Sequence, residues 1–317
     1  VYIPAAEMQQ LNEPLEGEFD GIGVVFNMAT DTVIVLNVIP QGPSDKAGIK
    51  AGDRIIEIND TLVAGQKIPQ RDVVKKLRGP RGTTVHLGLG RQGIGELVGV
   101  DVVRDKIPIK SIESAFRIAD GIGYIRHSDF TEGCYEDMRA AVEKLRTGGE
   151  LKGLILDYRS NGGGIMQEAV KILGMFVPKG TEVVSTKGRS EDSKQVFRTD
   201  TEPILADLPL TVLINGNSAS AAEIVAGALQ DLDRAVLIGQ RSFGKGLVQS
   251  PRPLGYNAML KLTTAKYYIP SGRCIQAIDY SHSQEGSVRA VPDSLISEFT
   301  TRAGRKVYDG GGEAPCR

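Results

Sequence analysis

The sequence LTVLINGNSASAAEIVAGALQD, residues 210–231, decides the fold of the second half of the chain. The apolar run at 210–214 predicts a buried strand. Ser220-x-x-Glu223 is a capping box, which is typical of a helix N-terminus. Apolar residues then recur at helical spacing from Ile224 to Leu229, and they predict a helix that follows the strand directly. A strand, a short turn and a buried helix indicate an α/β layer architecture.

The remainder of residues 108–317 repeats this alternation of strands and amphipathic helices. We expect strands at 121–126, 151–157, 183–185, 195–198 and 235–239, and helices at 133–145 and 167–176. The sequence therefore predicts a layered α/β domain over residues 108–317.

Residues 17–107 differ because strand signals dominate there. β-branched runs at 23–26 and 33–39 flank the polar stretch 27–31 and predict a hairpin. Further strands are expected at 54–60 and 84–89, and short helices at 43–49 and 70–77. This region is predicted to be a small, mostly β domain. A purely structural role for this domain, without ligand binding, stays an alternative.

Gly88-x-Gly90-x-x-Gly93 matches the dinucleotide-binding fingerprint as a string of letters. That motif requires a helix immediately after it. Residues 96–103 instead predict another strand, so we interpret the glycines as a hairpin turn and expect no nucleotide.

A candidate for chemistry is the pair formed by Ser220, at the start of the apolar helix, and Lys245, in a glycine-flanked segment expected to be a strand. Each has a plain structural explanation, a helix cap for the serine and a solvated edge residue for the lysine. However, a helix N-terminus also stabilises developing negative charge. Apolar surroundings lower the pKa of a lysine, as a neutral lysine base requires. The three histidines, His86, His127 and His282, lie in no motif of a general base.

These two segments resemble the C-terminal processing peptidases, also called tail-specific proteases. Residues 217–231 are similar to the family's Ser-Ala-Ser-Ala-Ser-Glu run and its helix, with Ala222 in place of the third serine. The resemblance implies that Ser220 is the nucleophile, Lys245 the general base and Gln249 the residue that positions the lysine. In a regular strand, Lys245 and Gln249 would face the same side.

Two further segments carry the same resemblance. Residues 159–164 are similar to the family's Arg-x-Asn-x-Gly-Gly motif, and this similarity implies an oxyanion hole formed by the N–H groups of Gly163 and Ala221. Residues 266–276 resemble its Tyr-x-Pro-Ser-Gly-Arg-x-Ile-Gln turn. Alone, residues 154–164 favour a plain strand–turn–helix connection, but four motifs in the right order are specific.

Residues 17–107 resemble a PDZ domain of the bacterial protease type. The resemblance lies in the sequence motif at residues 47–53 and in the order of the predicted strands and helices. The resemblance implies that the N–H groups of Gly21, Ile22, Gly23 and Val24 bind the terminal carboxylate of a peptide. The peptide would add as a strand to an open sheet edge.

The family resemblance sharpens the predicted organisation. We expect a crotonase-like core of repeated ββα units with an inserted PDZ domain. Residues 1–16 would be an N-terminal segment of the core, 17–107 the PDZ-like domain and 108–317 the protease core. We expect the sequence to be truncated at both ends, so homo-oligomerisation through segments absent from this chain stays an alternative.

Composition limits the partners. With 38 basic and 39 acidic residues, the net charge of −1 gives no reason to expect nucleic acid or an anionic membrane surface. The three cysteines, Cys134, Cys274 and Cys316, form neither a disulfide framework nor a metal pattern. We expect no cofactor and no metal. Family resemblance alone implies an extracytoplasmic location, in the bacterial periplasm or on the outer side of the membrane.

The sequence thus predicts a serine endopeptidase that cleaves polypeptides near apolar C-terminal tails, with a PDZ domain that binds tails and gates activity. Two alternatives come from other classes: a catalytically inactive PDZ adaptor, and an acyl-CoA enzyme of the crotonase type. The first would be expected to have lost a member of the predicted site, and the second would lack a PDZ domain.

Overall fold

The computed structural model describes the chain except for residues 6–7, 9–12, 14, 30, 280–288 and 317. The described residues form two compact units, Val1–Gly17 with Lys110–Arg317, and Glu18–Ile109. These bounds lie within two residues of those expected for the inserted domain. Residues 6–7, 9–12 and 14 of the predicted N-terminal segment lie outside the described residues.

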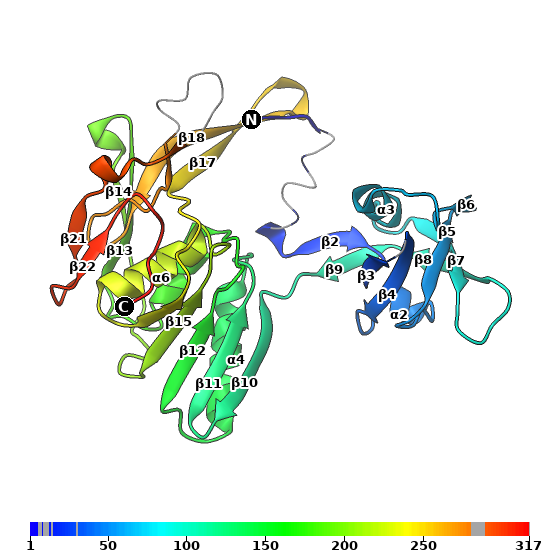
Figure 1. Cartoon of the computed structure of the whole chain (residues 1–317), viewed down its shortest axis with the longest axis horizontal. Helices are drawn as coiled ribbons and strands as arrows, with labels where there is room; N and C mark the ends of the chain where they lie inside the picture. The colour runs from blue at the N-terminus through cyan, green and yellow to red at the C-terminus, as the bar shows by residue number, and fades with distance from the viewer. Residues whose placement is uncertain (6–7, 9–12, 14, 30, 280–288, 317) are drawn as a thin grey trace. The chain divides into compact units, whose positions relative to one another are not determined.

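The inserted unit is built on one antiparallel sheet (Figure 1). The order of its strands is β3 (Val24–Ala29), β4 (Thr32–Val38), β5 (Arg54–Ile58), β7 (Thr84–Gly90) and β8 (Val98–Val103), with β6 (Thr61–Leu62) beside β5. Two short helices, α2 (Pro43–Lys46) and α3 (Gln70–Leu77), and the strand pair β2 (Glu18–Gly21) and β9 (Asp105–Pro108) complete it. Its core is aliphatic and includes Val33, Ile55 and Leu87, all fully buried.

The expected hairpins are present in this unit. β3 pairs with β4 down to Ala29 and Thr32, so the turn is shorter than the predicted stretch 27–31. β7 and β8 form an antiparallel hairpin around the glycines at 88–93, and no helix follows them. The predicted hairpin is therefore confirmed, although Gly88 and Gly90 lie in β7 and only Gly93 lies in the turn.

The larger unit contains a five-stranded sheet in the order β10 (Ile112–Ala119), β11 (Ile122–His127), β12 (Gly153–Asp157), β15 (Leu210–Ile214) and β16 (Val236–Gly239). β10 is antiparallel to β11, and the other four strands are parallel. The helices are α4 (Cys134–Thr147), α5 (Met166–Leu173) and α6 (Ala221–Asp231). The predicted strand–turn–helix over 210–231 is confirmed as β15 and α6.

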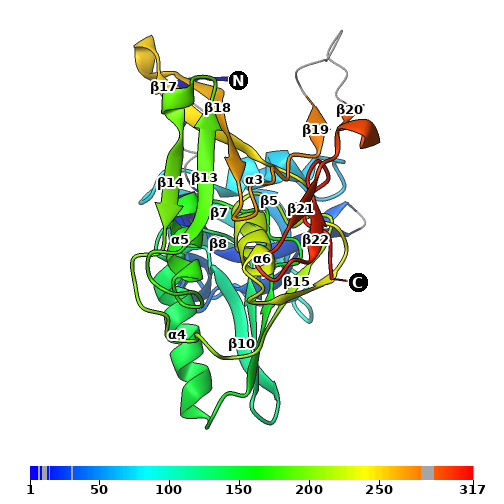
Figure 2. The same ribbon diagram turned by 90° about the vertical axis from the view of Figure 1, so that its left-hand side faces the viewer.

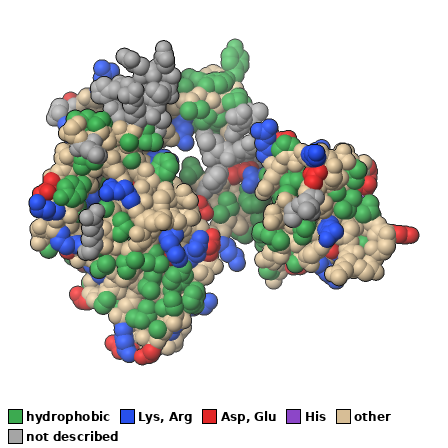
Figure 3. Space-filling view, viewed as in Figure 1, with side chains coloured by type: hydrophobic (Ala, Val, Ile, Leu, Met, Phe, Trp, Pro, Cys, Tyr) green, Lys and Arg blue, Asp and Glu red, His purple; other side chains and the backbone are tan. Residues whose placement is uncertain are grey.

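The three helices and the sheet enclose the core of this unit. Every residue of α6 is buried, because the sequence of this helix is apolar on nearly all sides. Fully buried residues from the sheet and the helices form one continuous cluster, among them Ile125, Leu156, Val212, Ile172 and Val225. Large apolar side chains also gather on the surface over the outer face of the sheet, as Figure 3 shows, and the exposed ones there include Phe116, Ile118, Val236 and Ile238.

A second, antiparallel sheet lies beside α6 (Figure 2). The ten-residue strand β18 (Met259–Tyr268) pairs with β1 (Tyr2–Ile3), β13 (Glu182–Gly188) and β17 (Leu247–Pro253), and β14 (Gln195–Arg198) pairs with β13. The remaining described elements are short. They are the strand pairs β19 (Ile278–Asp279) with β20 (Arg289–Ala290) and β21 (Glu298–Thr300) with β22 (Lys306–Tyr308), and the 3-10 turns Glu191–Ser193, Gly255–Asn257 and Asp293–Leu295. Among the described helices, none is both long and apolar enough to cross a bilayer.

Candidate active site

Three loops that leave the carboxyl ends of neighbouring parallel strands carry the predicted site. The glycine-rich turn with Gly163 follows β12, the segment with Ser220 follows β15, and the segment with Lys245 follows β16. Because parallel strands end at the same edge of the sheet, these three segments meet there, as is general for sites on such sheets. The fold therefore brings together residues that are up to 82 positions apart, from Gly163 to Lys245.

Ser220 is the N-cap of α6 and has a strained backbone. Its φ is 57° and its ψ is −116°, a combination that non-glycine residues rarely adopt. The preceding loop is fixed by Ser218, whose hydroxyl donates to the carbonyl oxygen of Tyr158 at 2.8 Å. Strain of this kind persists only where the surroundings impose it, and it is concentrated at functional sites.

The carboxylate of Glu223 joins the serine segment to the lysine segment. Its Oε2 accepts from the backbone N–H of Ser220 at 2.8 Å and from the backbone N–H of Lys245 at 2.9 Å. Its Oε1 accepts from Gly244 N–H at 2.7 Å and from the Ser242 hydroxyl at 2.5 Å. The side chain is fully buried. Burial raises the pKa of Glu223, while these four donors act in the opposite direction.

Tyr267 makes a second connection on the carbonyl side. Its buried hydroxyl donates to the carbonyl oxygen of Lys245 and, at 3.3 Å, to that of Ser220. One carboxylate and one phenol thus hold the same two residues, the first by their N–H groups and the second by their C=O groups. We call Glu223 and Tyr267 the clamp residues. They fix the backbones from which both proposed reacting side chains project.

Lys245 is half-buried, and burial lowers its pKa. The charge of Lys261 lowers this pKa further, and that of Glu223 raises it. The prediction that Lys245 lies in a strand is wrong, because β17 begins two residues later, at Leu247. The reason is that the N–H groups of Gly244 and Lys245 turn to the Glu223 carboxylate and not to a neighbouring strand, with Gly244 at a φ of 84°.

Gly163 lies directly against the nucleophile segment. A Cβ at this position would be 2.6 Å from Ala219 O, 2.7 Å from Ser220 Cβ and 2.9 Å from Ala221 N, so only glycine fits. Ala221 is the first residue of α6, where an N–H has no acceptor within the helix. The Gly163 N–H donates to Asn161 Oδ1 at 2.8 Å. The structure therefore brings the two predicted oxyanion donors together, with one of them occupied by a side chain.

Gln249 lies in β17, opposite Thr263, and is exposed. Because Lys245 precedes the strand, the alternation argument that placed both residues on one side does not extend to Lys245. The role of Gln249 in positioning the lysine stays a prediction.

Neither of the two described histidines, His86 and His127, forms a hydrogen bond with Ser220. His127 is fully buried against Phe130 and Tyr158, its Nε2 lies 2.8 Å from Asp129 O, and burial lowers its pKa to about 4. His86 is in the inserted unit, paired with Asp101 at 2.7 Å. His282 lies outside the described residues.

Sequence reasoning did not identify the clamp residues as part of the site. Glu223 was recognised only as the third helical position of a capping box, and its link to residues 242–245 depends on the fold. Tyr267 lies inside the quoted turn motif, but no sequence signal indicated that its hydroxyl reaches the serine.

In the inserted unit, the predicted carboxylate-binding residues form the connection between β2 and β3. Gly21 ends β2, Ile22 and Gly23 form the turn, and Val24 begins β3. Ile22 is buried, and its carbonyl oxygen accepts from Ser44 N–H at 2.9 Å. β3 is an edge strand of its sheet, so its outer side is open for strand addition.

The fold and this site define a two-domain α/β protein of the peptidase type. The model of peptidase family S41 matches residues 121–281, and that of the PDZ domain matches residues 21–102. The chain belongs to peptidase family S41, the C-terminal processing peptidases, and contains a PDZ domain.

Named relatives agree with this membership. The chain is 40% identical over 280 residues to the carboxy-terminal-processing protease of Bartonella bacilliformis, covering 87% of this chain and 63% of the relative. It is 34% identical over 277 residues to the carboxy-terminal processing protease CtpB of Bacillus subtilis, covering 87% and 57%. It therefore spans about 60% of the length of these relatives.

Among solved structures, the photosystem II D1 C-terminal processing protease is similar, with a TM-score of 0.51 and 28% identity. The match covers 86% of this chain and 73% of that chain. Within the described part of the chain, no group of three or more His, Cys, Asp or Glu side chains is arranged to hold a metal ion.

Proposed function

We propose that this chain is a serine endopeptidase in which Ser220 is the nucleophile and Lys245 the general base. The observation that carries the proposal is that the two clamp residues hold the backbones of Ser220 and Lys245 together, beside Gly163 and Ala221. A Ser/Lys pair and two backbone donors are the parts that acyl transfer needs.

The reaction proceeds by acyl transfer. Neutral Lys245 takes the proton of the Ser220 hydroxyl as its oxygen attacks the scissile carbonyl carbon. The N–H groups of Gly163 and Ala221 stabilise the oxyanion, and the ammonium of Lys245 returns the proton to the leaving amine. A water molecule, deprotonated by Lys245, then releases the acyl group from Ser220. The lowered pKa of Lys245 favours the neutral amine that this sequence requires.

Two roles in this proposal need rearrangement of side chains. The Gly163 N–H is bonded to Asn161 Oδ1, so a substrate oxyanion has to share or replace that bond. Gln249 has to turn toward Lys245 to hold the amine in line with the serine. Both changes follow the general observation that catalytic hydrogen bonds shorten on substrate binding.

The proposed substrates are polypeptides with accessible, apolar C-terminal tails. The tail adds to the edge strand β3, and its carboxylate is bound by the N–H groups at Gly21, Ile22, Gly23 and Val24. Tail binding then gates cleavage in the peptidase unit. The names of the relatives, which describe carboxy-terminal processing, support this substrate class.

Three further expectations from the family resemblance belong to the same proposal. These are a crotonase-like core, an extracytoplasmic location and homo-oligomerisation through segments outside this chain. The succession β10, β11 and α4 supports the first, because it is one ββα unit of the kind expected.

The dyad is tested by comparing casein cleavage by the parent chain with cleavage by the variants Ser220→Ala and Lys245→Ala. We expect both variants to lose activity, and an apolar C-terminal peptide to stimulate the parent. Activity that survives Ser220→Ala would overturn the proposal. If the folded parent binds the peptide but does not cleave casein, whether or not the peptide is present, the inactive adaptor is favoured. Turnover of acyl-CoA thioesters would instead favour the crotonase-type enzyme.

A further inference from the structure

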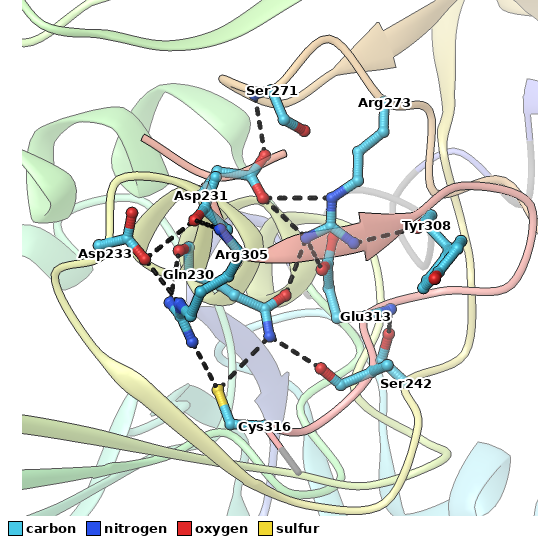
Figure 4. A network of polar contacts seen from close by, with 12 residues as sticks. Gln230, Asp231, Asp233, Ser242, Ser271, Arg273, Arg305, Tyr308, Glu313 and Cys316 are labelled. Atoms are coloured by element: carbon cyan, nitrogen blue, oxygen red, sulfur yellow. Dashed lines mark hydrogen bonds and ion pairs between the residues drawn. The ribbon is translucent and has the colours of Figure 1, made fainter. Parts of the chain in front are cut away.

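Residues 311–316 lie against α6 and are held by side chains and backbone groups from several elements (Figure 4). Gln230 of α6 donates its side-chain amide to Ala314 O at 2.9 Å. Gly312 N–H donates to Ile275 O at 3.0 Å, and Cys316 N–H to Leu237 O at 2.9 Å. We call these six residues the C-terminal stretch.

Ser242 connects the C-terminal stretch to the clamp. Its N–H donates to Glu313 O at 3.0 Å, and its hydroxyl oxygen accepts from Glu313 N–H at 2.6 Å. The same hydroxyl donates its proton to Glu223 Oε1 at 2.5 Å. A continuous chain of hydrogen bonds therefore runs from Glu313 through Ser242 and Glu223 to the backbones of Ser220 and Lys245.

The Glu313 side chain fixes the position of this stretch. It is fully buried, and its Oε2 accepts from Arg273 at 2.6 Å, while Oε1 has no hydrogen-bond partner among the described residues. Arg273, itself buried, also binds Asp231 and Gln230 of α6 (Figure 4). Arg273 pairs with the carboxyl groups of both Glu313 and Asp231, so one guanidinium is shared by two buried carboxyl groups and the charge of an ionised Glu313 is only partly compensated.

Gly227 provides independent evidence that the Glu313 carboxyl group occupies a closely packed site against α6, which we call its seat. A Cβ at this position of α6 would lie 2.4 Å from Glu313 Oε1 and 2.7 Å from its Cδ. Glycine in a helix interior costs about 1 kcal/mol relative to alanine. The absence of a side chain at Gly227 is therefore explained by the carboxyl group that occupies its place.

We propose that Glu313 is a positioning residue for the cleavage reaction, because its carboxyl group, held by Arg273, fixes the C-terminal stretch so that Ser242 holds Glu223. The inference rests on the proposed Ser/Lys function. Glu313 acts through Ser242 and Glu223 and does not touch the substrate.

The charged and titratable groups around Glu313 make its seat sensitive to pH. Asp231 and Glu223 on α6 and Tyr267 on β18 face it together with Arg273. Burial is the main cause that raises the pKa of Glu313, to about 8, and Asp231 and Glu223 raise it while Arg273 lowers it. Above that pH a further negative charge is buried beside Asp231 and Glu223. The seat then loosens, and the clamp loses its support from Ser242.

The experiment measures kcat, KM and thermal stability from pH 6 to about pH 9.5 for the parent, Glu313→Ala and Glu313→Gln. Glu298→Gln, at an exposed residue of β21, is the control. At pH 7 we expect kcat of Glu313→Ala to fall about tenfold to a hundredfold with KM nearly unchanged, as for a displaced catalytic group. Glu313→Gln, a neutral mimic, retains most of the activity.

The pH profile separates positioning from a merely structural role. The parent's kcat declines above pH 8, and this decline is missing in Glu313→Gln but kept in Glu298→Gln. The folded pKa of Glu313 lies above its ordinary value of 4.5, so the parent loses stability as the pH rises from 4.5 to about 8. Glu313→Gln lacks that loss.

An alkaline decline that persists in Glu313→Gln, or an unchanged kcat in Glu313→Ala, would overturn the inference. Should Glu313→Ala not fold, the profile of Glu313→Gln still decides. Gly227→Ala gives a second route, because its methyl group displaces the carboxyl group and is expected to lower kcat without removing a titratable group. The Ser220→Ala variant keeps the two questions apart. Cleavage activity that survives in this variant would refute the Ser/Lys dyad, but not the positioning role of Glu313.

Discussion

Replacing Glu223 with glutamine tests the clamp directly, because the change keeps size and shape and removes only charge and acceptor capacity. The carboxylate accepts four hydrogen bonds, two on each oxygen. A glutamine can direct its amide oxygen to the N–H groups of Ser220 and Lys245. Its NH₂ group then faces Ser242 and Gly244, where the Gly244 N–H has no acceptor.

The magnitude follows from that count. An unsatisfied buried N–H costs about 1–3 kcal/mol, and the remaining bonds lose their charge assistance, so we expect a loss of about 2–4 kcal/mol in the free energy of unfolding. This is below the total stability of a typical domain, about 5–15 kcal/mol, so the variant folds. Because Tyr267 still holds both carbonyl groups, we expect kcat to fall about tenfold and not to vanish.

The pH dependence of the variant has a definite sign. Lys245 must be neutral to act as a base, and the charge of Glu223 raises its pKa. Without that charge the pKa of Lys245 falls, so the ascending limb of kcat/KM moves to lower pH. Peptide cleavage across pH 5–10 and urea unfolding measure the two effects.

A matched control is Glu168→Gln, a buried carboxylate on α5 that accepts from Tyr135 N–H at 2.9 Å and from Lys171 at 2.6 Å. Glu168→Gln is expected to lower the free energy of unfolding and to leave the ascending limb of kcat/KM at the same pH. If Glu223→Gln moved the limb to higher pH, or left stability at the parent's value, the described clamp would be incorrect.

Three further substitutions address the same site. Lys261→Gln removes the charge that lowers the pKa of Lys245, so the ascending limb of kcat/KM should move to higher pH, opposite to Glu223→Gln; an unmoved limb would contradict the predicted coupling. Tyr267→Phe leaves two carbonyl groups without their shared donor, and we expect kcat to fall while KM changes little; a change confined to KM would assign the hydroxyl to substrate binding. Gly163→Ala places a methyl group 2.6 Å from a carbonyl oxygen at a φ of 93°, and the resulting displacement of the Gly163 N–H from the oxyanion position is expected to cost about a hundredfold or more in kcat. Its control is Gly162→Ala, where a Cβ meets open space and activity should stay near that of the parent.

Much of the secondary structure could be predicted because its signals are local. The helix α3 coincides with the predicted residues 70–77, and β15 with 210–214. The long strand β18 was not predicted. Its solvent exposure does not alternate, because three different strands pair with parts of it, and so the period-two pattern is missing.

The candidate site could be predicted only in part, for a similar reason. Ser220 and Gly163 lie in short motifs whose spacing is visible in the sequence. The hydrogen bonds that join these motifs are not local, since Glu223 accepts from residues 19 to 22 positions away and Glu313 N–H donates to Ser242 across 71 positions. Distances between such groups are set by the order of β12, β15 and β16 in the sheet, which no window of sequence contains.

The capping box shows why a structural and a catalytic interpretation of the same residues need not compete. Glu223 does cap α6, because it accepts from the N–H of Ser220. In an ordinary helix the second carboxylate oxygen would face water. Here both oxygens are buried and accept from residues 242–245, so the group that begins the helix also fixes the position of the proposed base. A cap that only stabilised α6 would tolerate aspartate or serine at a cost of helix stability, whereas this one must match the reach and charge of glutamate. Glu223→Asp should therefore lower kcat at least as much as Glu223→Gln, although it keeps the charge, and an Asp variant with parental kcat would reduce Glu223 to a helix cap.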